Sequence, residues 1–339
     1  MMERRQLGQR GPEVSRLALG TMTFGAESDE AASQEILDVF VEAGGVLIDT
    51  ADVYADGLSE HLVGAWLRAR PGRREQVVLA TKGRFPVAGQ PGASLRASYL
   101  RAALDASLDR LAVDRVDLYQ IHGPDLSTPL EEVVEFFEQA VASGKATYVG
   151  ASNLPGWQIA KLARLCQQAD VPLVAHQPQY SLLAREVEWE VMPAAIDAEL
   201  GALAWSPLGG GWLTGKYRRD EAPPARSRLG EDPNRGVEAW DRRGTERTWA
   251  VIDRLQQVAE EHGVSPAQAA LAWVADRPGV TSAIVGARTA DQLQQTVAAG
   301  SLHLDPAATT RLDDVSAPRM PDYPYGFVAE WAGVGDPDS

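Results

Sequence analysis

Short apolar runs alternate with longer amphipathic segments along the chain. The apolar runs are rich in β-branched and aromatic residues, and most of them end at a polar residue, a pattern typical of buried strands. Eight such strands are predicted, at residues 16–22, 46–49, 77–82, 116–122, 146–152, 173–177, 202–206 and 281–286.

Helices are predicted between these strands. Leucines recur at helical spacing in residues 94–111, and Ser94 is placed to cap that helix at its amino end. Further helices are expected at residues 29–43 and 129–143. Pro129 suits a first helical position, and Gly144 stands where a glycine commonly ends a helix.

The order of these elements predicts a closed (β/α)8 TIM barrel. Most consecutive strand ends lie 25 to 40 residues apart, which leaves room for one crossover helix and its loops. An open, doubly wound sheet is the competing arrangement. We expect one barrel domain over residues 1–339, preceded by a short hairpin at residues 5–17 with its turn near residues 8–11. A long loop, residues 218–244, follows the seventh strand.

Composition narrows the class of protein. The 339 residues carry 47 acidic and 32 basic side chains, a net charge of 32 − 47 = −15, which argues against a general nucleic-acid binder. The single cysteine excludes a disulfide framework. No apolar stretch is long enough to span a membrane, and the segment MMERRQLGQR lacks an apolar signal core. We therefore expect a cytoplasmic protein with no membrane or nucleic-acid partner.

Candidate chemistry lies where the predicted strands end. Asp49, Lys82 and His122 each occupy the last position of an apolar run, and Tyr54 follows Asp49 by five residues. Catalytic groups of barrels sit at the carboxyl ends of strands. Lys82 and Asp49 could pair there, and a cation near Tyr54 is expected to lower the pKa of its phenol. An acid, a cation and an oxyanion donor are the groups that carbonyl reduction requires.

Each of these residues also has a purely structural interpretation. A single Asp or Lys at a strand end is more often a structural ion pair, and a lone His is more often structural than catalytic. Their conjunction on one face favours function. Motifs for other chemistries are absent: there is no HExxH, GxSxG, Tyr-xxx-Lys or GxGxxG, and the remaining histidines are scattered, so no metal is expected.

Seven sequence motifs stand at or beside the predicted strand ends: LIDTADVY (47–54), ATKG (80–83), SLDRLAVDRVDLYQIHGPD (107–125), VGASN (149–153), HQPQYSLL (176–183), WSPLGGGWLTGKY (205–217) and IVGART (284–289). Together they resemble the aldo-keto reductase family, including its bacterial members and channel-associated β subunits. The resemblance runs from about residue 4 to about residue 316.

This resemblance implies a catalytic tetrad and an NADPH cofactor across the barrel mouth. The tetrad consists of Asp49, Tyr54, Lys82 and His122, with Tyr54 as the general acid. It implies that Ser152, Asn153 and Gln177 hold the nicotinamide carboxamide and that Trp205 stacks on the ring. The complete set of implied cofactor contacts is Gly20, Thr21, Met22, Asp49, Ser152, Asn153, Gln177, Trp205, Ser206, Pro207, Leu208, Gly209, Gly211, Lys216, Gly286, Arg288, Gln292 and Gln295.

The implied grip on the adenosine 2′-phosphate falls on Arg288. A guanidinium suits a phosphate dianion, so NADPH is expected to be preferred over NADH. Gln295 and Thr296 stand where the family commonly has Glu and Asn, and Gln292 aligns with a position that is sometimes a second Arg. His176 replaces a common Asn. Some use of NADH would fit these departures.

Three functions follow as hypotheses. The first is an NADP-dependent oxidoreductase that reduces an aldehyde or ketone, the second a Schiff-base aldolase using Lys82, and the third a non-catalytic NADPH-sensing subunit. The partner of the first is a small carbonyl substrate, and a homo-oligomer is possible. Cys166 is expected to pack within a helix over residues 154–169. Candidate pocket residues are Met22, Phe24, Tyr54, Phe85, Trp240, Tyr323, Tyr325, Phe327 and Trp331.

Overall fold

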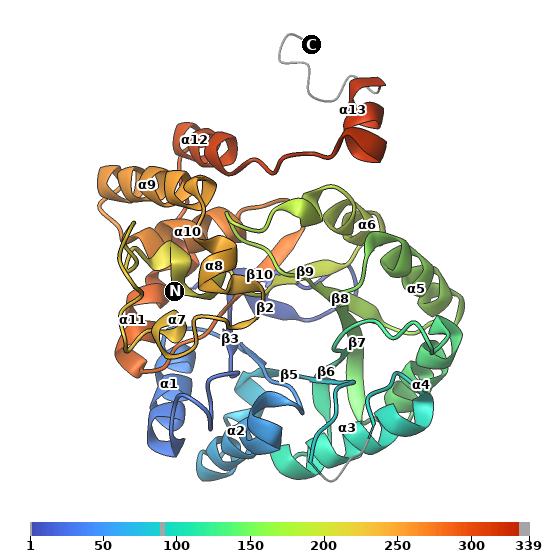
Figure 1. The fold of residues 1–339 in the computed structure, drawn as a ribbon. Coiled ribbons are helices and arrows are strands. Elements are labelled where there is room, and N and C mark those ends of the chain that lie inside the picture. The colour runs from blue at the N-terminus through green and yellow to red at the C-terminus, as the bar shows by residue number, and fades with distance from the viewer. Residues whose placement is uncertain (1, 89–91, 332–339) are drawn as a thin grey trace.

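The computed structural model, which describes residues 2–88 and 92–331, contains a closed barrel of eight parallel strands (Figure 1). β10 pairs with both β9 and β3, and this pairing closes the ring, so the TIM-barrel prediction is confirmed and the open sheet is wrong. Each strand lies within two residues of its predicted bounds: β3 Leu17–Gly20, β4 Leu47–Asp49, β5 Val78–Gly83, β6 Val116–Ile121, β7 Ala146–Ser152, β8 Leu173–Gln177, β9 Gly201–Ala204 and β10 Val280–Val285.

Helices surround the strands in Figure 1. The longer ones are α1 Glu30–Glu42, α2 Leu58–Ala69, α3 Ala97–Leu111, α4 Leu130–Ala142, α5 Gly156–Gln168, α6 Val191–Asp197, α9 Glu246–Glu261, α10 Pro266–Ala275, α11 Ala290–Val297 and α12 Pro306–Ser316. Ser94 does not cap α3, because that helix begins at Ala97 after Arg96. The hydroxyl of Ser94 instead accepts a hydrogen bond from the backbone of Arg96. Gly144, at φ +73°, follows the end of α4 as expected.

The predicted hairpin closes the amino-terminal end of the barrel. It consists of β1 Arg4–Gln6 and β2 Glu13–Ser15, which pair antiparallel. Leu7 and Val14 belong to the same buried cluster as inward-facing strand residues. Gly8, at φ +60°, is so close to β8 that a Cβ there would lie 2.5 Å from the carbonyl oxygen of Val174. The opposite, carboxyl-terminal end of the barrel therefore remains for the site.

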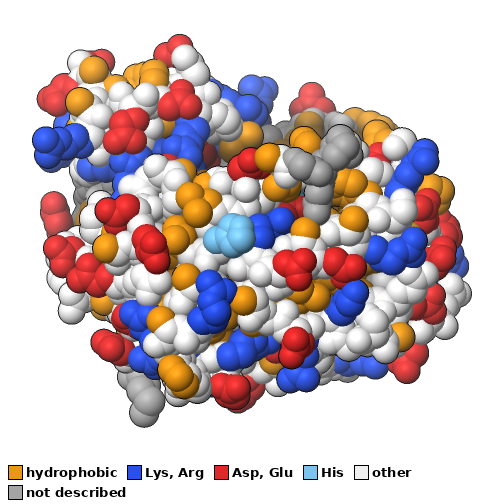
Figure 2. Space-filling view, turned by 90° about the horizontal axis from the view of Figure 1, so that it is seen from below, with side chains coloured by type: hydrophobic (Ala, Val, Ile, Leu, Met, Phe, Trp, Pro, Cys, Tyr) orange, Lys and Arg blue, Asp and Glu red, His pale blue; other side chains and the backbone are white. Residues whose placement is uncertain are grey.

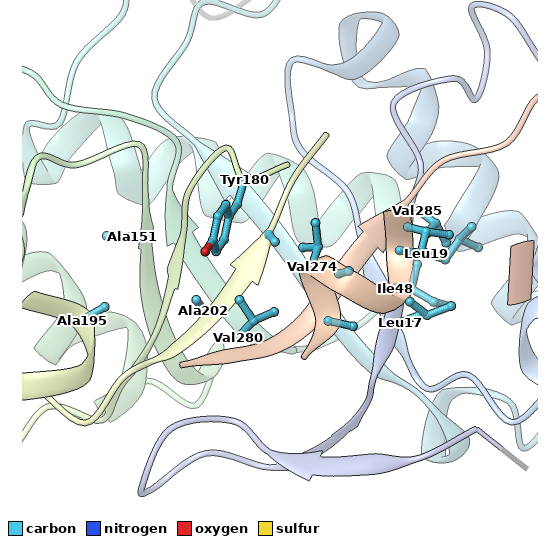
Figure 3. Packing of buried hydrophobic residues seen from close by; sticks show 14 of the residues in the cluster. Leu17, Leu19, Ile48, Ala151, Tyr180, Ala195, Ala202, Val274, Val280 and Val285 are labelled. Atoms are coloured by element: carbon cyan, nitrogen blue, oxygen red, sulfur yellow. The ribbon is translucent and has the colours of Figure 1, made fainter. Parts of the chain in front are cut away.

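Strand residues alternate between two cores. Ala18, Leu47 and Leu118 pack inside the barrel. Leu17, Leu19, Ile48 and Val285 pack outside it, between strands and helices (Figure 3). This alternation is why the strands read as continuous apolar runs, since both faces are buried.

The long loop, residues 218–244, contains only short helices, among them α7 Arg228–Glu231 and α8 Trp240–Arg243. At the carboxyl end α12 packs on α9, and α13 Phe327–Trp331 lies beyond the ring of helices (Figure 1). Figure 2 shows acidic and basic side chains interspersed over one face of the molecule. Among the described residues, no helix has the length and apolar content needed to cross a bilayer.

Candidate active site

Three side chains meet at the carboxyl end of the barrel. Asp49 ends β4, and Lys82 lies near the end of the adjacent strand β5. The Lys82 Nζ donates to Asp49 Oδ2 at 2.7 Å and lies 3.3 Å from the Tyr54 hydroxyl. The carbonyl oxygen of Thr50 accepts a third bond from the same ammonium at 2.8 Å. Neighbouring parallel strands thus bring together the pair and the phenol that the sequence predicted.

A tight turn fixes Tyr54 above this pair. Ala55, Asp56 and Gly57 all have positive φ, at 46°, 57° and 87°. Non-glycine residues adopt this region at a cost, and such strain concentrates at functional sites. The Asp56 carboxylate accepts a hydrogen bond from the backbone of Ala88 at 2.7 Å, which ties the turn to the loop after β5.

The pKa of Tyr54 moves opposite to the sequence expectation. Burial raises the pKa of its phenol, and the neighbouring Lys82 opposes this without overcoming it. The expected lowering is wrong because the sequence indicates the charge of Lys82 but not the burial that outweighs it. The raised pKa keeps the Tyr54 phenol protonated at neutral pH, the form that a proton donor needs.

The Lys82 ammonium is also held in its charged form. Burial alone would lower the pKa of Lys82, but Asp49 and Tyr54 outweigh burial and raise it. The side chain is completely buried. A charge at such a depth is tolerated because Asp49 neutralises it.

His122 directly follows β6 and stands edge-on to two aromatic rings. Its ring centroid lies 5.8 Å from that of Tyr54 and 5.1 Å from that of Phe85. Burial, together with Lys82 and Arg84, lowers the pKa of His122 well below its usual value, so the imidazole is neutral at neutral pH. Its Nδ1 is buried and has no hydrogen-bond partner among the described residues.

Two glutamines extend the network around Asp49. The Gln177 Nε2 donates to Asp49 Oδ1 at 2.9 Å, and the Gln120 Nε2 lies 3.3 Å from the same oxygen. Gln177 was expected to hold a carboxamide, yet its amide nitrogen is already engaged, which leaves its Oε1 for a ligand. Gln120 was not singled out from the sequence. Its position two residues before His122 could have indicated it, because residues two apart in a strand share one face.

Asn153 links three strand ends beside the tetrad. Its Nδ2 donates to the His122 carbonyl at 3.1 Å and to Ser152 Oγ at 2.9 Å, and its Oδ1 accepts from Trp205 Nε1 at 2.9 Å. Asn153 has a φ of +59°. Trp205, following β9, is half-buried. The residues predicted to surround the nicotinamide therefore do lie together.

Ser206, Pro207 and Leu208 lead from β9 into a glycine turn. Gly209, Gly210 and Gly211 have φ values of +57°, +64° and +103°. A Cβ at Gly211 would lie 2.8 Å from the Nζ of Lys216, so the turn and this lysine are in close approach. Glu238, which the sequence reasoning missed, accepts from Ser206 Oγ at 3.2 Å and lies under the turn.

Positive charge collects between this turn and the start of α11. Partial burial and the neighbouring Arg288 and Arg228 lower the pKa of Lys216. Arg288 directly precedes the N-cap of α11, and its backbone N–H donates to Gln292 Oε1 at 3.0 Å. Glu27 and Glu231 pair with Arg288 and offset part of this positive charge.

Further predicted residues lie at strand ends and on α11. Gly20 ends β3, Thr21 and Met22 follow it, and Gly286 follows β10. Gln295 and Thr296 lie on α11, where Gln295 is exposed and the Thr296 hydroxyl donates back to its own helix.

The prediction that Phe24 lines the pocket is wrong, because its side chain is fully buried in the core between strands and helices. The aromatic residues near the carboxyl end make no described contact with the tetrad. Tyr325 donates a hydrogen bond to Glu190 at 2.6 Å, and the side chains of Tyr323 and Trp331 are exposed.

Other singled-out residues are structural. His176 Nε2 accepts from the backbone of Leu154 at 3.2 Å, and burial lowers the pKa of His176 to about 3. Cys166 is buried in α5, which confirms packing, and burial raises its pKa to about 12. Within residues 2–88 and 92–331, no three His, Cys, Asp or Glu side chains form a metal cluster.

Comparison with known proteins assigns the chain to a family. The profile of the Aldo/keto reductase family matches residues 16–317, and the protein belongs to that family. It is 37% identical to "Uncharacterized oxidoreductase YrpG" of Bacillus subtilis (strain 168), over 93% of this chain and 96% of the relative.

Two further relatives differ in their described roles. The chain is 33% identical to a "Probable voltage-gated potassium channel subunit beta" of Arabidopsis thaliana, over 95% and 99% of the two chains. It is 31% identical to "Versiconal hemiacetal acetate reductase" of Aspergillus parasiticus, over 94% and 98%. Family membership and the reductase relatives support an oxidoreductase that acts on small carbonyl compounds.

Proposed function

We propose that the protein reduces an aldehyde or ketone to an alcohol with NADPH, and that Tyr54 is the general acid. The observation that carries this proposal is the Lys82 ammonium, bonded to Asp49 at 2.7 Å and set 3.3 Å from the Tyr54 hydroxyl. A buried cation beside a protonated phenol stabilises the negative charge that forms on that phenol when its proton leaves.

Each side chain has a distinct role in the proposed reaction. When bound, NADPH would supply the hydride that adds to the carbonyl carbon. Tyr54 donates its proton to the carbonyl oxygen, Lys82 stabilises the resulting phenolate, and Asp49 keeps Lys82 charged and oriented. Neutral His122 binds the same oxygen through a ring N–H. The aromatic edges of Tyr54 and Phe85 hold the His122 ring in place.

The residues present fit NADPH as the cofactor. Asn153, Ser152 and the Oε1 of Gln177 would hold the carboxamide, with Trp205 against the ring. The glycine turn and Lys216 would meet the pyrophosphate. Arg288 would meet the 2′-phosphate. The support for an anion here is that Lys216, Arg228 and Arg288 lie near one another, with Glu27 and Glu231 offsetting part of their charge.

A Schiff-base aldolase is disfavoured by the state of Lys82. A nucleophilic amine must be neutral, whereas contact with Asp49 and Tyr54 raises the pKa of Lys82. The hypothesis of a non-catalytic NADPH-sensing subunit is supported by the similarity to the channel β subunit. Turnover separates it from an enzyme, because a sensor would bind NADPH without oxidising it in the presence of carbonyls. We place the proposed reductase in the cytoplasm.

The first test is a fluorescence titration with NADPH and, in parallel, NADH. The half-buried Trp205 should be quenched when a nicotinamide stacks on it, so Trp205→Phe should lose much of the signal while retaining binding. Saturable quenching followed by carbonyl-dependent oxidation of NADPH supports the proposal. Absence of binding to either nucleotide contradicts it.

A further inference from the structure

Arg288, the proposed 2′-phosphate ligand, already has two carboxylate partners. Its Nη1 and Nη2 donate to the two carboxylate oxygens of Glu231 at 2.9 and 2.7 Å, and its Nε donates to Glu27 at 2.5 Å. Paired donation of this kind is how a guanidinium binds either a carboxylate or a phosphate. The carboxylate of Glu231 therefore takes the contacts that a 2′-phosphate would take.

The carboxylates of Glu27 and Glu231 differ in how firmly they are held beside Arg288. The side chain of Glu27 is 11% exposed and also pairs with Arg235 at 2.5 Å, so it is held on both sides. The side chain of Glu231 is 48% exposed, and the Arg288 guanidinium is its only ion-pair partner within the described part of the chain. Glu231 lies in the long loop, on the four-residue helix α7, so its side chain can turn away from Arg288 without moving a barrel strand.

We propose that Glu231 is a specificity-determining residue that competes with the 2′-phosphate of NADPH for Arg288. This inference rests on the proposed function, and within it on Arg288 facing the adenosine end of the cofactor. NADPH must displace Glu231, whereas NADH, which carries a hydroxyl at that position, leaves the Arg288–Glu231 pair in place. The pair thus weakens NADPH binding relative to NADH binding.

The test compares ligands with and without the 2′-phosphate. Dissociation constants for NADPH, NADH, 2′,5′-ADP and 5′-AMP are measured by calorimetry on the wild type, Glu231→Gln and the control Glu221→Gln. Glu221 is an exposed acid of the same long loop and forms no ion pair among the described residues. If the paired state dominates by about ten to one, its removal tightens binding of the 2′-phosphate ligands by about tenfold.

The expected result is selective. Glu231→Gln should bind NADPH and 2′,5′-ADP more tightly, with NADH and 5′-AMP changed less than twofold, and Glu221→Gln should behave as the wild type. Equal changes for all four ligands, no change, or weaker NADPH binding would overturn the role of Glu231. Failure of the wild type to bind both NADPH and NADH would instead overturn the proposed function.

Discussion

The two ends of the proposed cofactor site are built in opposite ways. At the tetrad, the paired side chains of Lys82 and Asp49 are 0% and 3% exposed and come from adjacent barrel strands. At the adenosine end, Arg288 and Glu231 are 20% and 48% exposed and come from segments beside a strand end and within the long loop. In the proposed function, the rigid barrel would place the chemistry and a loop residue would tune the choice of cofactor, in keeping with a fold that varies function through its loops.

This contrast has an energetic side. Breaking a buried ion pair from one side leaves an uncompensated charge, which costs several kcal/mol, whereas exposed pairs contribute little to stability. The same bond type therefore serves different purposes at the two ends.

The largest effect on stability is expected from Lys82→Met. It leaves the buried Asp49 carboxylate without its cation, so the free energy of unfolding should fall by about 3 to 5 kcal/mol in urea titrations. The double variant Asp49→Asn/Lys82→Met, which removes both charges, should recover part of the loss. A loss below about 1 kcal/mol in the single variant would contradict the role of the pair.

A neighbouring carboxylate should give a pH-dependent effect. Asp52 is fully buried, and neither carboxylate oxygen has a hydrogen-bond partner among the described residues. Burial, reinforced by Glu60, raises the pKa of Asp52 from 3.8 to about 7. Because the folded state binds this proton more tightly, the contribution of Asp52 to the free energy of unfolding is greatest at low pH. It is lost as pH rises from the unfolded pKa toward 7.

Asp52→Asn should remove this dependence. Relative to the variant, the wild type should lose about 2 to 3 kcal/mol of unfolding free energy between pH 5 and pH 8, measured by urea titration at each pH. Asp109 is exposed, so Asp109→Asn serves as the control. Its free energy of unfolding should change with pH in parallel with that of the wild type. Parallel curves for Asp52→Asn as well would show that Asp52 does not titrate in this range.

The smallest effect on stability is expected from Glu231→Gln. Its pair with Arg288 is partly exposed, so the free energy of unfolding should change by less than about 1 kcal/mol, and less still at high salt. A loss as large as that of Lys82→Met would show that the long loop is part of the cooperative core. The contrast between the two ends would then be wrong.

The sequence predicts the barrel and the tetrad because both follow from local pattern. Strands buried on both faces are continuous apolar runs, and a charge at the end of such a run must lie at the barrel mouth. This placed Asp49, Lys82 and His122 correctly. The position of Tyr54 came from its spacing after Asp49 and from the family resemblance.

What the sequence did not reveal depends on tertiary burial and loop contacts. The direction of the Tyr54 pKa shift required knowing that burial outweighs Lys82. The Arg288–Glu231 pair joins residues 57 positions apart in segments without periodicity, so no pattern marks it. The hydrogen bond between Gln177 and Asp49 joins residues 128 positions apart and likewise cannot be predicted from the sequence.

The most direct test of the account is Tyr54→Phe, which removes the proposed proton and keeps the ring. Carbonyl-dependent oxidation of NADPH is measured alongside NADPH binding by fluorescence. If Tyr54 is the general acid, turnover falls by at least about 100-fold while the dissociation constant for NADPH stays unchanged. Normal turnover by a variant that binds NADPH normally would contradict the assignment of Tyr54 as the acid.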